Sequence, residues 1–179
     1  IALGSSATVC AGDVETVLGL WGAQSGPWTG QIEIYGPDGT EPETVGLKTR
    51  WEPVPGNGAR TETVTKIETF TTSSQQHSSV TLIFADPQPN VIMTPYFVGG
   101  KQHNFRFSVI SVSVVDSSHW TTVIASPDDQ EIYEGRPAVL RYVRTRSGDT
   151  IQNTKEVNFL DDDGDDTFEL RSFIRQTLM

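Results

Sequence analysis

The stretch Gly26–Tyr35 constrains the fold of this chain more than any other, because its side chains alternate with a period of two. One face carries apolar or small residues, and the other carries mostly polar ones. The apolar face consists of Trp28, Gly30, Ile32 and Ile34. Such a period is typical of a β-strand with one face on a core and the other in water. The sequence therefore predicts a strand here, around which the remaining strands are arranged.

About ten runs of strand length extend from Gly26 to the C-terminus, roughly a dozen residues apart. Turn sequences join them, for example at residues 36–39, 99–100 and 147–149. No helical patterns alternate with these runs, which excludes Rossmann and TIM-barrel arrangements, and no internal repeat indicates a propeller. We expect an all-β fold, an antiparallel up-and-down β-barrel of about 8–10 strands.

A short helix is predicted before the first strand, over residues 13–21. Asp13 is a suitable N-cap, and four apolar side chains fall on one helical face. These are Val14, Val17, Leu18 and Trp21. We expect this helix to close one end of the barrel. Residues 13–179 are then a single barrel domain, preceded by residues 1–12.

The phase of the apolar pattern changes within the run His103–Val114. Apolar residues occupy odd positions up to Val109 and even positions from Ile110 onward. A slip of one residue indicates a β-bulge or a sharp bend, which barrels use to turn corners. We predict such a feature between Val109 and Ile110.

Residues 1–12 read as the end of a signal peptide or as a flexible arm. An apolar start is followed by small residues, and Val9-Cys10-Ala11 resembles a cleavage site. The segment therefore predicts a secreted or periplasmic protein in which Cys10 is removed, lipidated or retained. As the single cysteine, Cys10 excludes an internal disulfide and a multi-cysteine metal site.

The charge of the chain limits its partners. There are 23 acidic and 13 basic residues, which gives a net charge of −10. Nucleic acids and anionic membranes attract basic surfaces, so neither is expected as a partner. No run approaches the length of a transmembrane segment. We expect a monomer or a homodimer.

These features together resemble the calycin superfamily, which comprises lipocalins, fatty-acid-binding proteins and their bacterial relatives. Gly26-Pro27-Trp28 is similar to the lipocalin Gly-x-Trp motif that follows a short helix, and Gly19-Leu20-Trp21 is a second match. The segment from Tyr133 to Arg171 resembles small bacterial barrel domains without an assigned activity. The resemblance covers most of residues 13–177, and it implies a barrel that encloses a small ligand.

The resemblance also implies that a late arginine, Arg171 or Arg175, packs across Trp28 in a cation–π contact. Two family features are absent from the sequence, the lipocalin cysteine pair and the glycine-rich Trp motif of nitrobindin-like haem barrels. We therefore predict no haem and no other cofactor.

No catalytic or metal-binding motif stands out. There is no Gly-x-Ser-x-Gly elbow, Walker loop or Rossmann fingerprint. The acidic run Asp161–Asp166 lacks the spacing of an EF-hand and is better read as a hairpin turn. His77, His103 and His119 have no metal-ligand spacing. No metal site is predicted.

Candidate ligand-binding residues come from strands that mix aromatic and basic side chains. His103 shares a face with Phe105 and Phe107 and is expected at the barrel mouth. Arg106 lies on the same strand, and Arg141 alternates with valines. A buried arginine needs an anion or several acceptors.

Our hypothesis is that Arg106 or Arg141, together with Tyr96 or Tyr142, reaches into the cavity. The alternative is that these arginines pair with carboxylates outside. The leading function is reversible binding of a small, mostly apolar and possibly anionic ligand. Two alternatives remain. One is a barrel enzyme that uses His103 or His119 in acid–base chemistry of the isomerase or cyclase type, and the other is a packed structural or interaction module without a cavity or ligand.

Overall fold

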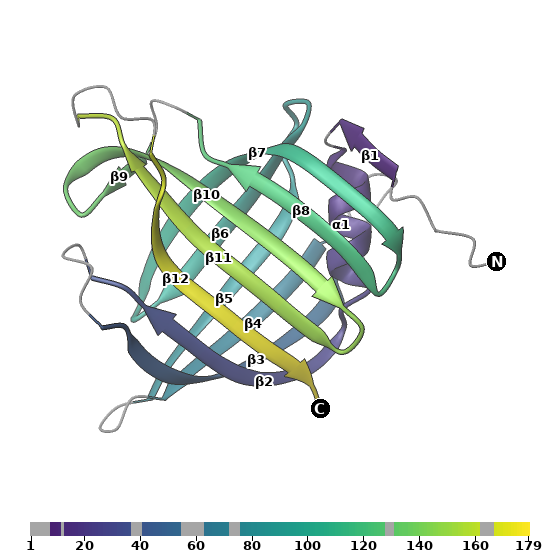
Figure 1. The fold of residues 1–179 in the computed structure, drawn as a ribbon, viewed down its shortest axis with the longest axis horizontal. Coiled ribbons are helices and arrows are strands. Elements are labelled where there is room, and N and C mark those ends of the chain that lie inside the picture. Colours follow the sequence, from purple (N-terminus) through teal and green to yellow (C-terminus); the bar gives the residue numbers. More distant parts are fainter. Residues whose placement is uncertain are drawn as a thin grey trace.

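The computed structural model describes residues 8–11, 13–36, 41–54, 63–71, 76–127, 131–161 and 167–179. Within these ranges the chain forms twelve strands and one helix (Figure 1). Their bounds are β1 Thr8–Ala11, α1 Val14–Gly22, β2 Gly26–Ile34, β3 Glu43–Val54, β4 Thr63–Thr71, β5 Gln76–Ala85, β6 Val91–Val98, β7 Lys101–Asp116, β8 His119–Ala125, β9 Glu131–Tyr133, β10 Arg136–Ser147, β11 Thr150–Phe159 and β12 Glu169–Leu178.

The strands form one antiparallel sheet that curls into a barrel. Each strand from β2 to β7 pairs with the next one in the chain. β8 then pairs with β10, which continues through β11 to β12, and β12 pairs with β2. The ring β2–β3–β4–β5–β6–β7–β8–β10–β11–β12 is therefore closed, and the short β9 lies beside β10. The prediction of an all-β up-and-down barrel is confirmed.

β2 lies at the closure of the ring, between β3 and β12. Trp28 and Ile32 are buried, as the period of two predicts, while Ile34 at the far end is partly exposed. Gly30 stands between them, where the backbone of β12 comes very close. The inward face of this strand is thus the one that the sequence indicates.

The predicted slip in β7 is present. Val109 is 3% exposed, Ile110 55% and Val112 1%, so the buried face changes from odd to even residues. The register against β8 shifts between Val109 and Ser111. The extra residue, Ile110, projects outward, which is the usual consequence of a β-bulge.

α1 closes one end of the barrel, as expected (Figure 1). The Asp13 side chain accepts a hydrogen bond from the Glu15 backbone N–H at 3.0 Å and caps the helix. The helix packs against β3, β4, β5 and β7. Its buried side chains are the four that the pattern predicts, Val14, Val17, Leu18 and Trp21. Within the described residues, no helix has the length and apolar character needed to cross a membrane.

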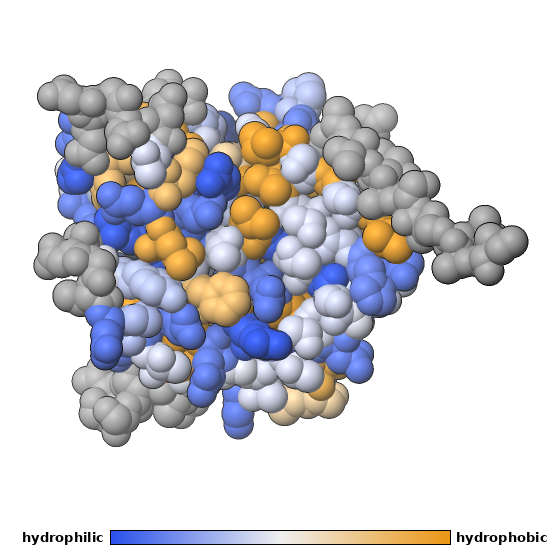
Figure 2. All heavy atoms as spheres, viewed as in Figure 1, coloured by the Kyte–Doolittle hydropathy of each residue, from blue (hydrophilic) through white to orange (hydrophobic). Residues whose placement is uncertain are grey.

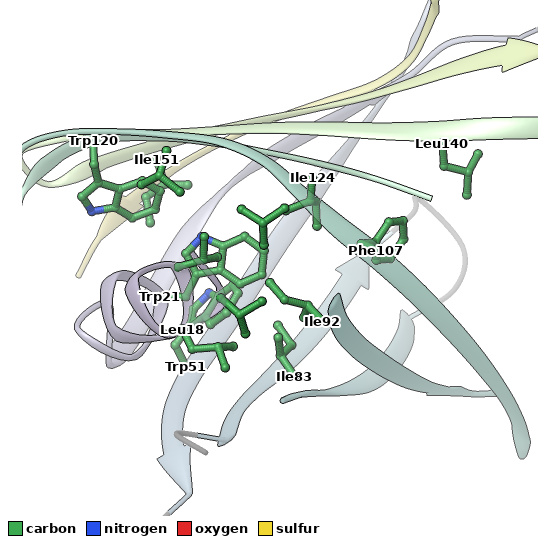
Figure 3. Close-up of a cluster of buried hydrophobic side chains, with 14 of the residues drawn as sticks. Leu18, Trp21, Trp51, Ile83, Ile92, Phe107, Trp120, Ile124, Leu140 and Ile151 are labelled. Atoms are coloured by element: carbon green, nitrogen blue, oxygen red, sulfur yellow. The ribbon is translucent and has the colours of Figure 1, made fainter. Parts of the chain in front are cut away.

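The main core lies between this helix and the barrel wall. Figure 3 shows Leu18 and Trp21 of α1 beside Trp51 and Ile83, with Ile92 close by. Trp21 and Trp51 meet edge to face, with ring centroids 6.4 Å apart. The helix therefore fills one end of the barrel, and further space inside the barrel lies beyond it.

β1 is an addition that the sequence did not indicate. Thr8 to Ala11, which we assigned to the segment before the barrel domain, pair with Ser111–Val114 of β7. The same β7 residues pair with β8, so β1 lies on the opposite edge of β7. β6 pairs with β7 only as far as Ser108, and β1 occupies the edge that β6 leaves.

Candidate functional site

A cavity of about 510 Å³ lies inside the barrel. Its lining comes from Trp21 of α1 and from strands β2, β3 and β5–β12. Small-molecule sites usually measure about 300–1,000 Å³. The barrel therefore encloses a space large enough for a small molecule between the described side chains.

A row of aromatic rings forms one wall of this cavity. His103, Phe105 and Phe107 project from alternate positions of β7, and Tyr96 lies beside His103 on β6. Adjacent ring centroids along the row are 6.2–6.3 Å apart. At the inner end, Phe107 meets Tyr142 of β10 edge to face at 5.3 Å. Five of the seven residues proposed from the sequence thus lie together on the cavity wall.

The charged groups in the lining are all basic. Arg144, Lys155 and Arg171 contribute to it, and the described lining residues include no Asp or Glu. This contrasts with the net charge of −10 for the whole chain. A cavity that concentrates cations in an acidic protein favours an anionic occupant.

Arg144 is the most deeply buried of these cations, with 6% of its surface exposed. Its Nη2 donates to the Gln24 side-chain oxygen at 2.7 Å, and its Nε has no hydrogen-bond partner among the described atoms. The guanidinium carbon lies 4.3 Å from the centroid of the Trp51 ring. Burial lowers the pKa of Arg144 to about 9. The positive charge is thus desolvated, and no described carboxylate compensates it.

Two structural elements hold Arg144 in place. On β10 it pairs with Asn153 of β11, which also lines the cavity. Its partner Gln24 is fully buried just after α1, where the Gln24 backbone oxygen accepts a hydrogen bond from the Trp28 indole N–H at 2.8 Å. The end of the helix and the first barrel strand therefore fix the position of the guanidinium group.

Arg171 lies elsewhere on the wall, on β12, with 4% of its surface exposed. Its Nη2 is 2.7 Å from a Glu169 carboxylate oxygen, and its Nη1 donates to the Gly36 carbonyl oxygen at 3.1 Å. Unlike Arg144, this arginine has a carboxylate partner. Arg144 is accordingly the better candidate to hold a ligand anion.

The prediction that Arg106 or Arg141 reaches into the cavity is wrong. Arg106 lies 3.1 Å from the Asp86 carboxylate, and Arg141 donates to Glu156 at 2.6 Å. Neither lines the cavity. The reason is geometric, since neighbouring residues of a strand face opposite sides, and the inner face belongs to Phe105 on β7 and to Tyr142 on β10. Figure 2 shows hydrophilic side chains between scattered apolar ones on one outer face of the molecule.

The predicted packing of Arg171 or Arg175 across Trp28 is also wrong. Arg146 of β10 takes this position, with its guanidinium carbon 5.7 Å from the Trp28 ring centroid. Arg175 pairs with the outward-facing Gln31. Arg171 lies near Phe159 instead, at 5.4 Å. The aromatic–cation contact exists, but a different strand supplies the cation.

Among the described side chains, no histidine is paired with a carboxylate in the cavity. His103 contacts the rings of Tyr96 and Phe105 and no described carboxylate. His119 Nδ1 lies 3.1 Å from Asp116, but this pair is exposed on the β7–β8 hairpin and does not line the cavity. The side chain of His77 lies outside the described residues.

No group of three potential metal ligands occurs among the described side chains. Most of the acidic run Asp161–Asp166, residues 162–166, falls outside the part that the structure describes.

Comparison with known proteins supports the fold and does not address the function. No family model and no curated protein matches this chain. A solved structure, that of Rv2717c from M. tuberculosis, is similar with a TM-score of 0.59 and 10% sequence identity. The match covers 93% of this chain and 99% of that one. The chain thus shares the curled antiparallel β-sheet fold of that protein over nearly its whole length.

Proposed function

We propose that this protein reversibly binds a small amphipathic ligand whose acidic group lies at Arg144. The observation that carries this proposal is the buried guanidinium of Arg144, which lines the cavity without a described carboxylate partner. A desolvated charge is costly unless it is paired. A ligand carboxylate would supply the missing negative charge, and Asn153 beside it offers a further hydrogen bond donor.

The rest of the cavity suits an apolar body. Ile32, Ile83, Ile124 and Ile174 line it together with the aromatic row. Apolar walls with a few converging polar groups are characteristic of small-molecule sites. The arrangement supports a binding protein rather than an acid–base enzyme, because the described cavity lining holds no histidine–carboxylate pair.

A comparison of an acid with its alcohol tests this proposal. Dodecanoate and dodecanol have the same apolar chain, so the ratio of their dissociation constants, measured by calorimetry, reports the contribution of the charge. We expect the wild-type protein to bind dodecanoate about 10- to 100-fold more tightly, as for a hydrogen bond to a charged group. Arg144→Gln should remove this preference while leaving dodecanol affinity nearly unchanged.

Arg141→Gln is the matched control, because it removes the same charge from the outer face of the same strand. It should leave the preference for the acid intact, and a thermal melt of each variant checks that the barrel remains folded. Equal affinities of the wild-type protein for acid and alcohol would overturn the placement of an anion at Arg144. Absence of binding for both would overturn the carrier function itself.

A further inference from the structure

The aromatic row on β7 points to a particular kind of ligand body. The planes of His103 and Phe105 differ by 12°, and those of Phe105 and Phe107 by 27°. Because these side chains occupy alternate positions of one strand, the row extends over about 13 Å. Three nearly parallel rings thus follow one another along a single wall.

The row leads from the open end of the barrel toward the buried cation. His103 is exposed, Phe105 is partly buried and Phe107 is 4% exposed. Phe107 contacts Tyr142, and Arg144 is the next residue of β10 that faces inward. A ligand with its acidic group at Arg144 would therefore lie along the rings.

Aliphatic side chains lie on the strands furthest from this row in the ring. In the closed ring of ten strands, β2 lies five places from β7 and so directly across the barrel. Its Ile32 and Ile34, with Ile174 of β12, line the cavity there. The cavity thus has the ring row on the side of β6 and β7, and branched aliphatic side chains of β2 and β12 beside Trp51 of β3 on the other. A flat body can contact the rings with its π-system and the isoleucines with its other face.

From this arrangement we infer that the ligand is a planar conjugated acid, an aromatic or polyene carboxylate, rather than a saturated one. The inference rests on the proposed function, since it takes the position of the acidic group at Arg144 as given. A saturated chain would bury the same apolar surface, but it has no π-system to place against the rings.

The test compares a conjugated tetraene fatty acid with the saturated fatty acid of the same length. Both carry one carboxylate, so the ratio of their dissociation constants reports the contribution of the conjugated body. The wild-type protein should bind the tetraene about five-fold more tightly, the size of effect that aromatic contacts give. Phe105→Leu should reduce this ratio to near one, because leucine keeps an apolar side chain at this position but offers no ring.

Phe97→Leu provides the control. Phe97 is 39% exposed and does not line the cavity, so its loss should not change the ratio. Absorption spectra add a second readout, because the tetraene band should shift to the red in the wild-type complex and shift less in Phe105→Leu.

The two proposals fail in different ways. If both acids bind and Phe105→Leu leaves the ratio of their dissociation constants unchanged, the planar-ligand inference is wrong and the carrier function stands. The same conclusion follows if the wild-type protein prefers the saturated acid. If neither acid binds, both the inference and the proposed function are wrong.

Discussion

Gln176 of β12 donates a hydrogen bond to the Thr49 hydroxyl of β3 at 2.6 Å, although β2 lies between these two strands. The residue of β2 that pairs with Gln176 is Gly30. The absence of a side chain there leaves room for Gln176 to cross. Both partners are buried, at 2% and 3% exposure. One side-chain contact thus ties together the two neighbours of the closing strand.

Gly30→Ala should destabilise the barrel strongly. A Cβ at this position would collide with the Arg175 carbonyl oxygen and lie 2.7 Å from the Gln176 Cα. Both are backbone atoms, so relief requires β2 and β12 to separate. We expect a loss of about 1–3 kcal/mol or more in the free energy of unfolding, measured with urea. Gly46→Ala is the control, since nothing lies within 4 Å of the Cβ that alanine would add there. Equal stability of the two variants would contradict the close approach.

The contact between Thr49 and Gln176 predicts a coupled pair. Thr49→Val leaves the buried amide of Gln176 without its acceptor, at a cost of about 1–3 kcal/mol. In Thr49→Val/Gln176→Leu both polar groups are gone. Gln176→Leu should therefore lower the free energy of unfolding clearly less in the Thr49→Val protein than in the wild-type protein. Urea unfolding of the four proteins completes the cycle. Additive costs would show that the hydrogen bond contributes nothing to the closure of the ring.

The β7–β8 hairpin predicts a carboxyl group with an unusually low pKa. Hydrogen bonds from the Ser118 side chain and backbone, followed by His119, lower the pKa of Asp116 from 3.8 to about 2. The stabilisation it gives is therefore complete above pH 3.8 and disappears as the pH falls through about 2. Ser118→Ala should raise this pKa, as followed by carboxyl NMR shifts, whereas Ser117→Ala should not. An unchanged value in Ser118→Ala would exclude the hydroxyl as the main cause.

Asp13→Ala should loosen the helix that closes the barrel. Asp13 accepts hydrogen bonds from the Glu15 N–H at 3.0 Å and from the Thr16 hydroxyl at 2.7 Å. Removing such a cap costs about 0.5–2 kcal/mol, and Asp13→Asn should retain most of it because Asn caps equally well. Thermal unfolding of both variants provides the comparison. If Asp13→Asn destabilises the protein as much as Asp13→Ala does, the charge of Asp13 matters more than its capping geometry.

The features predicted correctly from the sequence are those that depend on residues close to one another in the chain. The capped helix over residues 13–21, the inward face of Trp28 and the bulge after Val109 each follow from a pattern within a dozen residues. Strand alternation and helical periodicity act over such distances. The row of His103, Phe105 and Phe107 belongs to the same class, since one strand supplies all three.

The errors concern relations between strands that are distant in sequence. Alternation separates Arg141 from Tyr142 and Arg144, but both faces of β10 carry apolar residues, so the pattern alone does not show which face is inside. Val139 is 7% exposed and Leu140 3%, although they face opposite ways. The position of Arg146 over Trp28 depends on how α1 and β10 meet β2. Sheet order and tertiary packing determine such contacts, and no local pattern encodes them.

The division of β7 between two partners bears on how the barrel opens. Lys101–Ser108 pair with β6, while β8 begins only at Ser108, so within the described strands Lys101–Phe107 have a ladder on one side only. Every second amide there lacks a strand partner and should exchange rapidly in heavy water, whereas Ser111–Val114, held between β8 and β1, should exchange slowly. The wall that carries the aromatic row should therefore open locally at a lower free energy than the part of β7 that is paired on both sides. A ligand of the proposed kind would enter beside these rings while the other pairings of the barrel remain intact.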